Sequence, residues 1–102
     1  MTVATNMLQE NVIININDEL HSLTELFKYN GWQIETPDGL SDKIIYSKLG
    51  NETEYFKMEQ DGHYIYVSVP LKNSSFQYKT KFDDHYSAIK YTRTMFNYFI
   101  EI

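Results

Sequence analysis

The 102-residue chain contains no cysteine and little glycine or proline, with four and two residues. Without a thiol it can form no disulfide, no cysteine nucleophile and no zinc site built on thiolates, and this fits a reducing compartment. No apolar run approaches the roughly 18 residues of a membrane span, and the first ten residues do not join a basic segment to an apolar one. We therefore expect a cytoplasmic protein without a membrane segment.

Sequence motifs of catalysis and cofactor binding are also missing. The glycines stand singly at turn-like positions, so no glycine-rich phosphate loop is present, and there is no G-x-S-x-G motif. The three histidines, His21, His63 and His85, belong to different segments. His85 follows Asp83 and Asp84, a group that could hold a divalent ion, although acidic residues in this position more often begin a helix. We predict no enzymatic activity, no metal and no cofactor.

Tyrosine, in contrast, is abundant. Aromatic residues make up 16% of the chain, with nine tyrosines and six phenylalanines, and hydrophobic residues make up 42%. A chain of this length forms one domain with one small core, and this aromatic share exceeds what we expect such a core to need. Tyrosine suits half-wet surfaces and interfaces. We expect a single domain over residues 6–102, preceded by a flexible N-terminus of residues 1–5.

Hydrophobic periodicity predicts a helix near the N-terminus. Over residues 8–27 apolar side chains recur every three or four positions, which is the stripe of an amphipathic helix. The alternative makes residues 12–16, which are rich in isoleucine and valine, a short strand, with Asn17 or Asp18 capping a shorter helix. Residues 18–29 are helical in both interpretations.

After Gly31, which should end this helix, the hydrophobic period changes from 3.6 to 2. Asp61-Gly62 is a two-residue hairpin signal, and consecutive hairpins imply an antiparallel meander because parallel strands need long crossovers. The predicted strands are 32–36, 43–49, 52–60, 63–71 and 76–82, followed by a helix over 84–101 capped by Asp83 or Asp84. The fold class is α+β, with an N-terminal and a C-terminal helix packed on one face of a four- to five-stranded antiparallel sheet.

Two helices can cover only one face of such a sheet. Strand alternation assigns the more apolar set to the covered face: Phe56, Met58, Ile65, Val67, Val69, Leu71, Phe76, Tyr78 and Phe82. The alternate positions form what we call the open face, where tyrosines are interleaved with lysines. Its predicted protein-binding residues are Tyr46, Tyr55, Tyr64 and Tyr66, although the strand that carries Tyr46 could adopt either phase.

Charge is divided unevenly along the chain. Residues 1–42 carry one basic and seven acidic residues, whereas residues 43–102 carry eight basic and seven acidic ones. The first helix should therefore present an acidic surface around Asp18, Glu19 and Glu25, which would suit a basic partner.

These features together predict a non-catalytic, protein-binding protein: a small acidic adaptor, chaperone or inhibitor that occupies a partner's surface. The abundance of isoleucine, tyrosine, asparagine and lysine is typical of A/T-rich coding, which phages and viruses share with low-GC bacteria. A homodimer through the open face is the simplest form of such binding. The alternative is a single-stranded nucleic-acid platform, in which tyrosines stack on bases while Lys57, Lys79 and Lys81 contact phosphates.

Overall fold

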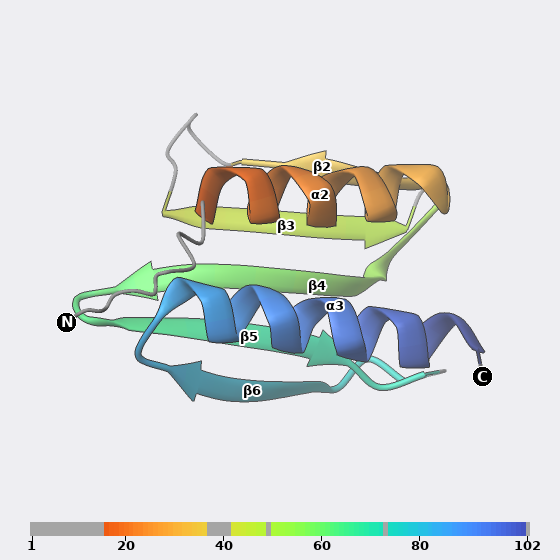
Figure 1. Cartoon of the computed structure of the whole chain (residues 1–102). Coiled ribbons are helices and arrows are strands. Elements are labelled where there is room, and N and C mark those ends of the chain that lie inside the picture. The colour runs from red at the N-terminus through yellow and green to blue at the C-terminus, as the bar shows by residue number, and fades with distance from the viewer. Residues whose placement is uncertain (1–15, 37–41, 49, 73, 102) are drawn as a thin grey trace, which may run out of the picture.

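In the part of the chain that the structure describes, five antiparallel strands in chain order form one sheet, accompanied by two helices (Figure 1). The computed structural model describes residues 16–36, 42–48, 50–72 and 74–101. The elements are α2 (Ile16–Tyr29), β2 (Trp32–Glu35), β3 (Lys43–Lys48), β4 (Asn51–Asp61), β5 (Tyr64–Pro70), β6 (Gln77–Phe82) and α3 (His85–Glu101). The strand order is β2-β3-β4-β5-β6, with every neighbouring pair antiparallel. The α+β class and the antiparallel meander predicted from the sequence are confirmed.

Helix α2 contains residues 18–29, which both interpretations of the first helix required. It already includes Ile16 and Asn17, so the strand alternative does not extend to Ile16. Residues 12–15, the longer helix from residue 8 and the predicted flexible N-terminus lie outside the described residues. The helix ends as predicted at Gly31, whose φ is 84° and whose amide donates to the carbonyl of Lys28 at 2.9 Å.

The hairpin between β4 and β5 differs from its prediction by one residue. Asp61 pairs with Tyr64, so the two-residue loop is Gly62-His63 rather than Asp61-Gly62. Gly62 has a φ of 66°, the left-handed conformation that the first loop position of such a tight hairpin requires. Gly62 therefore lies in the turn as expected, whereas Asp61 is the last residue of β4.

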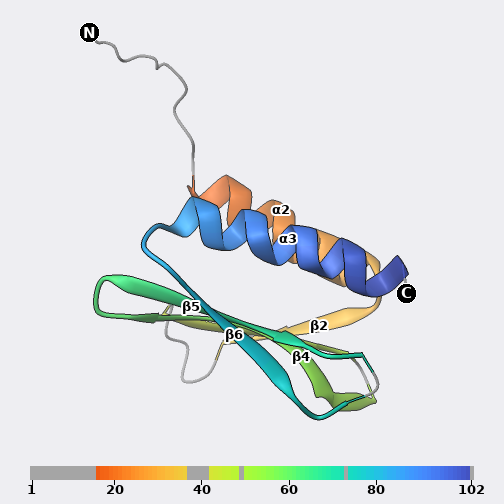
Figure 2. The same cartoon turned by 90° about the horizontal axis from the view of Figure 1, so that it is seen from below.

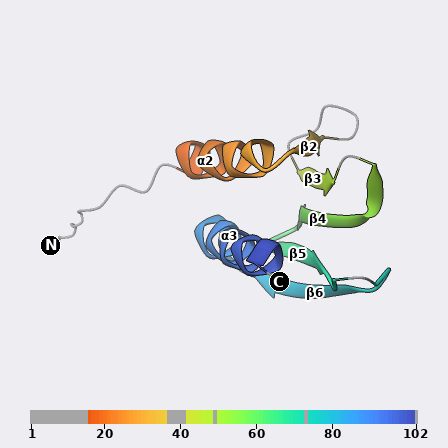
Figure 3. The same cartoon turned by 90° about the vertical axis from the view of Figure 1, so that its right-hand side faces the viewer.

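Both helices lie on the same side of the sheet (Figures 2 and 3). Helix α2 packs against β2, and α3 packs mainly against β5 with a smaller contact to β6. Asp84 caps α3 as predicted, because its Oδ1 accepts the backbone N–H of Ser87 at 2.7 Å. The buried face of α3 contains Ala88, Ile89, Thr92, Phe96 and Phe99, whereas Ile100 is exposed.

Phe27 of α2 lies at the centre of an aromatic core. Its ring stacks on Tyr46, with centroids 4.0 Å apart and planes 1° from parallel, and lies 3.9 Å from the ring of Phe96. Trp32 and Phe56 make edge contacts with it at 5.6 and 5.3 Å. Such pairs stabilise a core beyond simple burial. Among these core rings, Tyr46 is the one that we expected on the open face instead.

Candidate functional site

The first predicted site residue, Tyr46, is not on the open face. It pairs with Phe56 across β3 and β4 on the side that faces the helices, and it is fully buried. Its hydroxyl lies 2.8 Å from Thr24 Oγ1, and burial raises the pKa of the phenol while this hydrogen bond acts in the opposite direction. The prediction that Tyr46 lies on the open face is therefore wrong. Ile44 and Ile45 make both phases of β3 apolar, and the stack on Phe27 selects the phase with Tyr46 inside.

The other three predicted tyrosines, Tyr55, Tyr64 and Tyr66, do lie on the open face. Strand register places them on the side opposite the buried Phe56, Ile65 and Val67, the alternation that a two-faced sheet requires. Tyr55 and Tyr66 are half-buried among their neighbours, and Tyr64 is 41% exposed. This face is consequently a mixed surface rather than a continuous sheet of exposed rings.

Charged side chains form a ladder across the open face. Lys43, Glu59, Tyr66 and Lys81 occupy successive positions on β3, β4, β5 and β6. The Glu59 carboxylate lies 3.4 Å from Lys43 Nζ and 3.6 Å from Lys57 Nζ. Partial burial raises the pKa of Glu59, but the two ammonium groups outweigh it and leave the pKa below its usual value.

The lysines of the nucleic-acid alternative all face this side of the sheet, and each already has an intramolecular contact. Lys57 pairs with Glu59, as described. The ammonium of Lys81 lies 4.4 Å from the centroid of the Tyr64 ring, and that of Lys79 lies 5.2 Å from the centroid of Tyr66. These are cation–π distances. A base that stacked on either ring would have to displace a lysine, which weakens the support for a stacking platform.

The acidic surface of α2 lies on the other side of the molecule from the open-face tyrosines, because both helices cover the opposite face of the sheet (Figure 2). Asp18 and Glu25 are exposed, and Glu19 is half-buried. Lys28 approaches Glu25 at 3.9 Å, a loose and exposed pair. The structure does not bring the two predicted binding surfaces together, so one partner patch of ordinary size would contact one or the other.

Sequence reasoning missed a third surface at the outer edge of β6. Phe76 and Tyr78, which we expected beneath the helices, are 72% and 62% exposed, and Tyr98 of α3 is 63% exposed. Tyr91 marks the side of α3 that faces β6, since its hydroxyl lies 3.4 Å from Thr80 Oγ1. Tyr98 follows Tyr91 by seven residues, which is two turns further along the same side of α3, toward its C-terminal end.

The loop that leads into β6 places Phe76 at the same end. Leu71 donates its backbone N–H to the Phe76 carbonyl, and Lys72 donates its ammonium to the carbonyl of Phe99 beside Tyr98. We call Phe76, Tyr78 and Tyr98 the β6-edge surface. In Figure 1, α3 overlies β5, and β6 lies beyond it at the outer margin of the sheet.

The numbers of helices and strands expected from the sequence already indicate that part of the sheet is left uncovered. A helix is about 10 Å wide and strands are about 4.8 Å apart, so two helices cover about four strands. Five predicted strands therefore leave one outer strand uncovered. That Tyr78 belongs to the uncovered strand, with Phe76 just before it, depends on where α3 lies, and this is a tertiary property.

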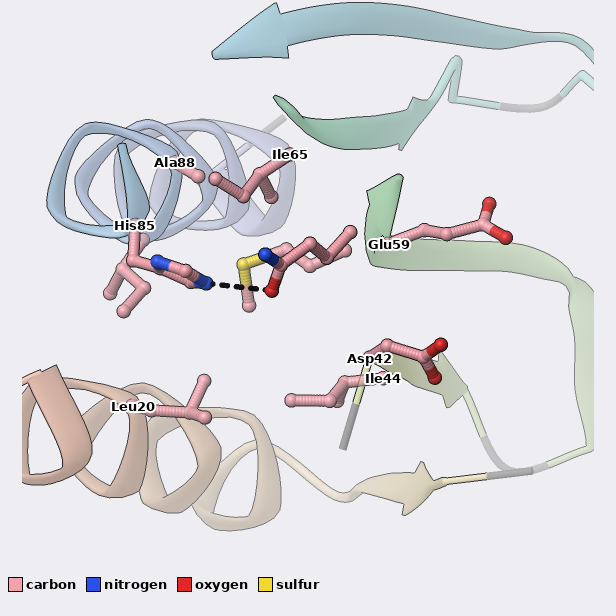
Figure 4. Close-up of a pocket in the computed structure, with 10 residues that line it drawn as sticks. Leu20, Asp42, Ile44, Glu59, Ile65, His85 and Ala88 are labelled. Carbon is pink, nitrogen blue, oxygen red and sulfur yellow. Dashed lines mark hydrogen bonds between the residues drawn. The ribbon is translucent and has the colours of Figure 1, made fainter. Parts of the chain in front are cut away.

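A small apolar cavity of about 50 Å³ lies between the N-terminal parts of α2 and α3 and the sheet (Figure 4). At its rim His85 Nε2 lies 3.2 Å from Gln60 Oε1. The carboxylates of Asp42 and Glu59 point away from His85 in this view, so these groups do not converge on one reacting atom. Its volume is well below the ~300 Å³ of small ligand pockets, and it can hold little more than a water molecule or a methyl group.

Within residues 16–36, 42–48, 50–72 and 74–101, no three histidine, aspartate or glutamate side chains are grouped as metal ligands. No helix in these ranges is both long enough and apolar enough to span a membrane. Comparisons with protein-family models, with curated proteins and with solved structures find no match. The function must therefore be argued from the surfaces themselves.

Proposed function

We propose that this chain is a non-catalytic, protein-binding protein, an adaptor, chaperone or inhibitor that acts by occupying part of a partner's surface. The observation that carries the proposal is the β6-edge surface. Phe76, Tyr78 and Tyr98 are each more than 60% exposed; Phe76 and Tyr78 lie at the start of the outer strand β6, and Tyr98 lies near the C-terminal end of α3. Exposed aromatic clusters beside polar groups are typical of protein interfaces, and isolated ones are not.

The open face and the β6-edge surface differ in how much of each aromatic ring is exposed. On the open face, Lys79 and Lys81 lie over Tyr66 and Tyr64, so part of each ring is already in contact. The rings of the β6-edge surface are more exposed than either. A partner that covers the β6-edge surface would bury more aromatic area, and each fully buried large side chain contributes about 1.5–3 kcal/mol. This difference favours the edge as the contact surface, while the open face and the acidic helix stay predicted contacts of lesser support.

Site-specific photo-crosslinking tests the proposal, because it captures a partner whose identity is not known. A benzophenone amino acid replaces Tyr78 on the edge, Tyr64 on the open face or Tyr29, which is 90% exposed at the end of α2 near the other edge. All three positions hold exposed tyrosine, so the substitution is matched in size and chemistry. Each variant is irradiated in lysate of its native host and analysed by mass.

We expect a discrete covalent adduct with the probe at position 78 and none with the probe at position 29. An adduct from position 64 alone would overturn the placement at the edge and return the contact to the open face. No adduct from any of the three positions would contradict protein binding itself. A binding experiment with labelled single-stranded DNA at low salt examines the alternative, which requires that Lys57→Glu abolish binding.

A further inference from the structure

Among the described residues, strand β6 is an outer strand that pairs with another strand on one side only. Its six residues pair with β5, and β6 is the last strand in the sheet order, so its other side presents backbone N–H and C=O groups outward. The opposite outer strand, β2, has four residues. An extended segment of another protein could add to β6 by backbone hydrogen bonds, a recognised mode of peptide binding.

The two sides of β6 have different chemistry. Lys79 and Lys81 project on the open-face side, and both are exposed. Tyr78 and Thr80 project on the helix side, because they pair with the buried Val69 and Val67. In an added strand, successive side chains also alternate between the two sides. Its residues would therefore meet two ammonium groups on one side and aromatic rings on the other.

A second copy of this chain fits the edge poorly. Two registers pair most of β6 with itself in antiparallel orientation while keeping all helices on one side. One places Lys79 directly opposite Lys79 of the other copy, and the other places Lys79 opposite Lys81. Like charges directly opposite each other destabilise strand pairs, and lysines on an outer strand oppose self-association in this way. The same lysines favour a strand whose residues at these positions are acidic.

We propose that β6 binds an extended segment of a partner protein in which acidic residues alternate with aliphatic ones, by antiparallel strand addition. The acidic residues lie beside Lys79 and Lys81, and the aliphatic ones cover Tyr78. This inference rests on the proposed function, because it assigns the partner's chemistry and binding mode to the same edge. Exposed ion pairs are individually weak, so backbone hydrogen bonds and ring burial supply the affinity and the charges supply the selectivity.

Capped, fluorescein-labelled peptides test the inference by fluorescence anisotropy. The probe carries three glutamates alternating with valines between serine caps, and the control replaces every glutamate with lysine. We expect the glutamate probe to bind about tenfold more tightly than the lysine control at low salt. The doubly substituted variant Lys79→Glu, Lys81→Glu should reverse this preference. The matched variant Lys48→Glu, Lys90→Glu makes the same change in net charge away from β6 and should retain it.

N-methylation of the probe separates strand addition from attachment by side chains alone. In an antiparallel ladder only alternate residues of the added strand direct their N–H groups to the neighbouring strand. Methylation of one alternate set should therefore abolish binding, while methylation of the other set should leave it within about twofold. Equal effects of the two sets, equal binding of the two charge types or absence of binding by every probe would each overturn the inference. Crosslinking at position 78 in lysate distinguishes these failures from failure of the protein-binding function, because it does not depend on the partner's charge or conformation.

Discussion

Tyr46→Phe is the most informative single substitution in this chain, because it removes one hydroxyl and keeps the ring. In the structure the ring stacks on Phe27 and the hydroxyl lies 2.8 Å from Thr24 Oγ1. Phenylalanine keeps the stacked ring, so the stability that the variant loses is that of one partly buried hydrogen bond. A typical value is about 1 kcal/mol, which would lower the midpoint of thermal unfolding of a domain this size by roughly 4–8 °C.

Urea unfolding followed by tryptophan fluorescence measures this change. Trp32 is the single tryptophan and is buried beside Phe27, so its emission reports loss of the core. With a typical dependence on urea, a loss of about 1 kcal/mol shifts the midpoint by about 0.3–1 M. Thr24→Val completes a double-mutant cycle. The double variant should lose less than the sum of the two single variants, since the shared hydrogen bond is lost only once.

Tyr46→Phe should also change how the stability of the protein depends on pH. Burial raises the folded-state pKa of Tyr46 above the ordinary value of 10.0, so the folded protein holds this proton more tightly than the unfolded chain. The resulting stability is complete below pH 10.0 and is lost as the pH rises through the folded-state pKa. Tyr46→Phe has no such proton to lose. Its deficit against the wild type should therefore shrink as the pH rises above 10.0.

Tyr55→Phe is the matched control, because Tyr55 lies on the open face and should change stability by less than about 0.5 kcal/mol. The reasoning fails if Tyr46→Phe is as stable as the wild type at pH 7 and the two unfold in parallel at alkaline pH. That result would mean that the Tyr46 hydroxyl is in solvent, where the sequence-based hypothesis placed it.

Substitutions at three further positions test the local interactions that support the sheet and α3. Asp84→Ala should lower the thermal midpoint by a few degrees at pH 7, because the hydrogen bond from the Ser87 backbone stabilises the ionised carboxylate and lowers its pKa. This stability is present above the ordinary pKa of 3.8 and is lost as the pH falls through the folded-state pKa, so thermal scans should show the difference between variant and wild type shrinking as the pH falls below 3.8. Glu59→Gln should destabilise by less than about 1 kcal/mol in urea, and the effect should disappear near 1 M salt; an effect independent of salt would refute the ion-pair account. Gly62→Val should cost about 1–2 kcal/mol through its φ of 66° alone, since no atom lies within 4 Å of an added Cβ, and Gly62→Asn should cost clearly less; equal costs would contradict the conformational explanation.

Interactions between neighbours in sequence determined most of the architecture. Helix α3 could be placed to within a residue because Asp84 supplies a cap and the buried positions recur with a helical period. The order of strands followed from short turns, which permit only antiparallel neighbours. Even the displaced turn at Gly62-His63 retained its glycine at the position of positive φ. Each of these features depends on a few adjacent residues, so each could be predicted locally.

Which side of β3 is buried, and whether the apolar side of β6 is exposed, could be decided only from the tertiary structure. Apolar residues occupy both sides of β3 at Ile44 and Ile45, so periodicity alone leaves the phase of Tyr46 open, and Phe27, nineteen positions away, decides it. Likewise, the pattern of β6 says that Tyr78 belongs to its apolar side, but the position of α3 over β5 decides that this side stays exposed. The aromatic surplus was evident from composition. Its division between a stacked core and the β6-edge surface depends on contacts between segments far apart in sequence, which no local pattern encodes.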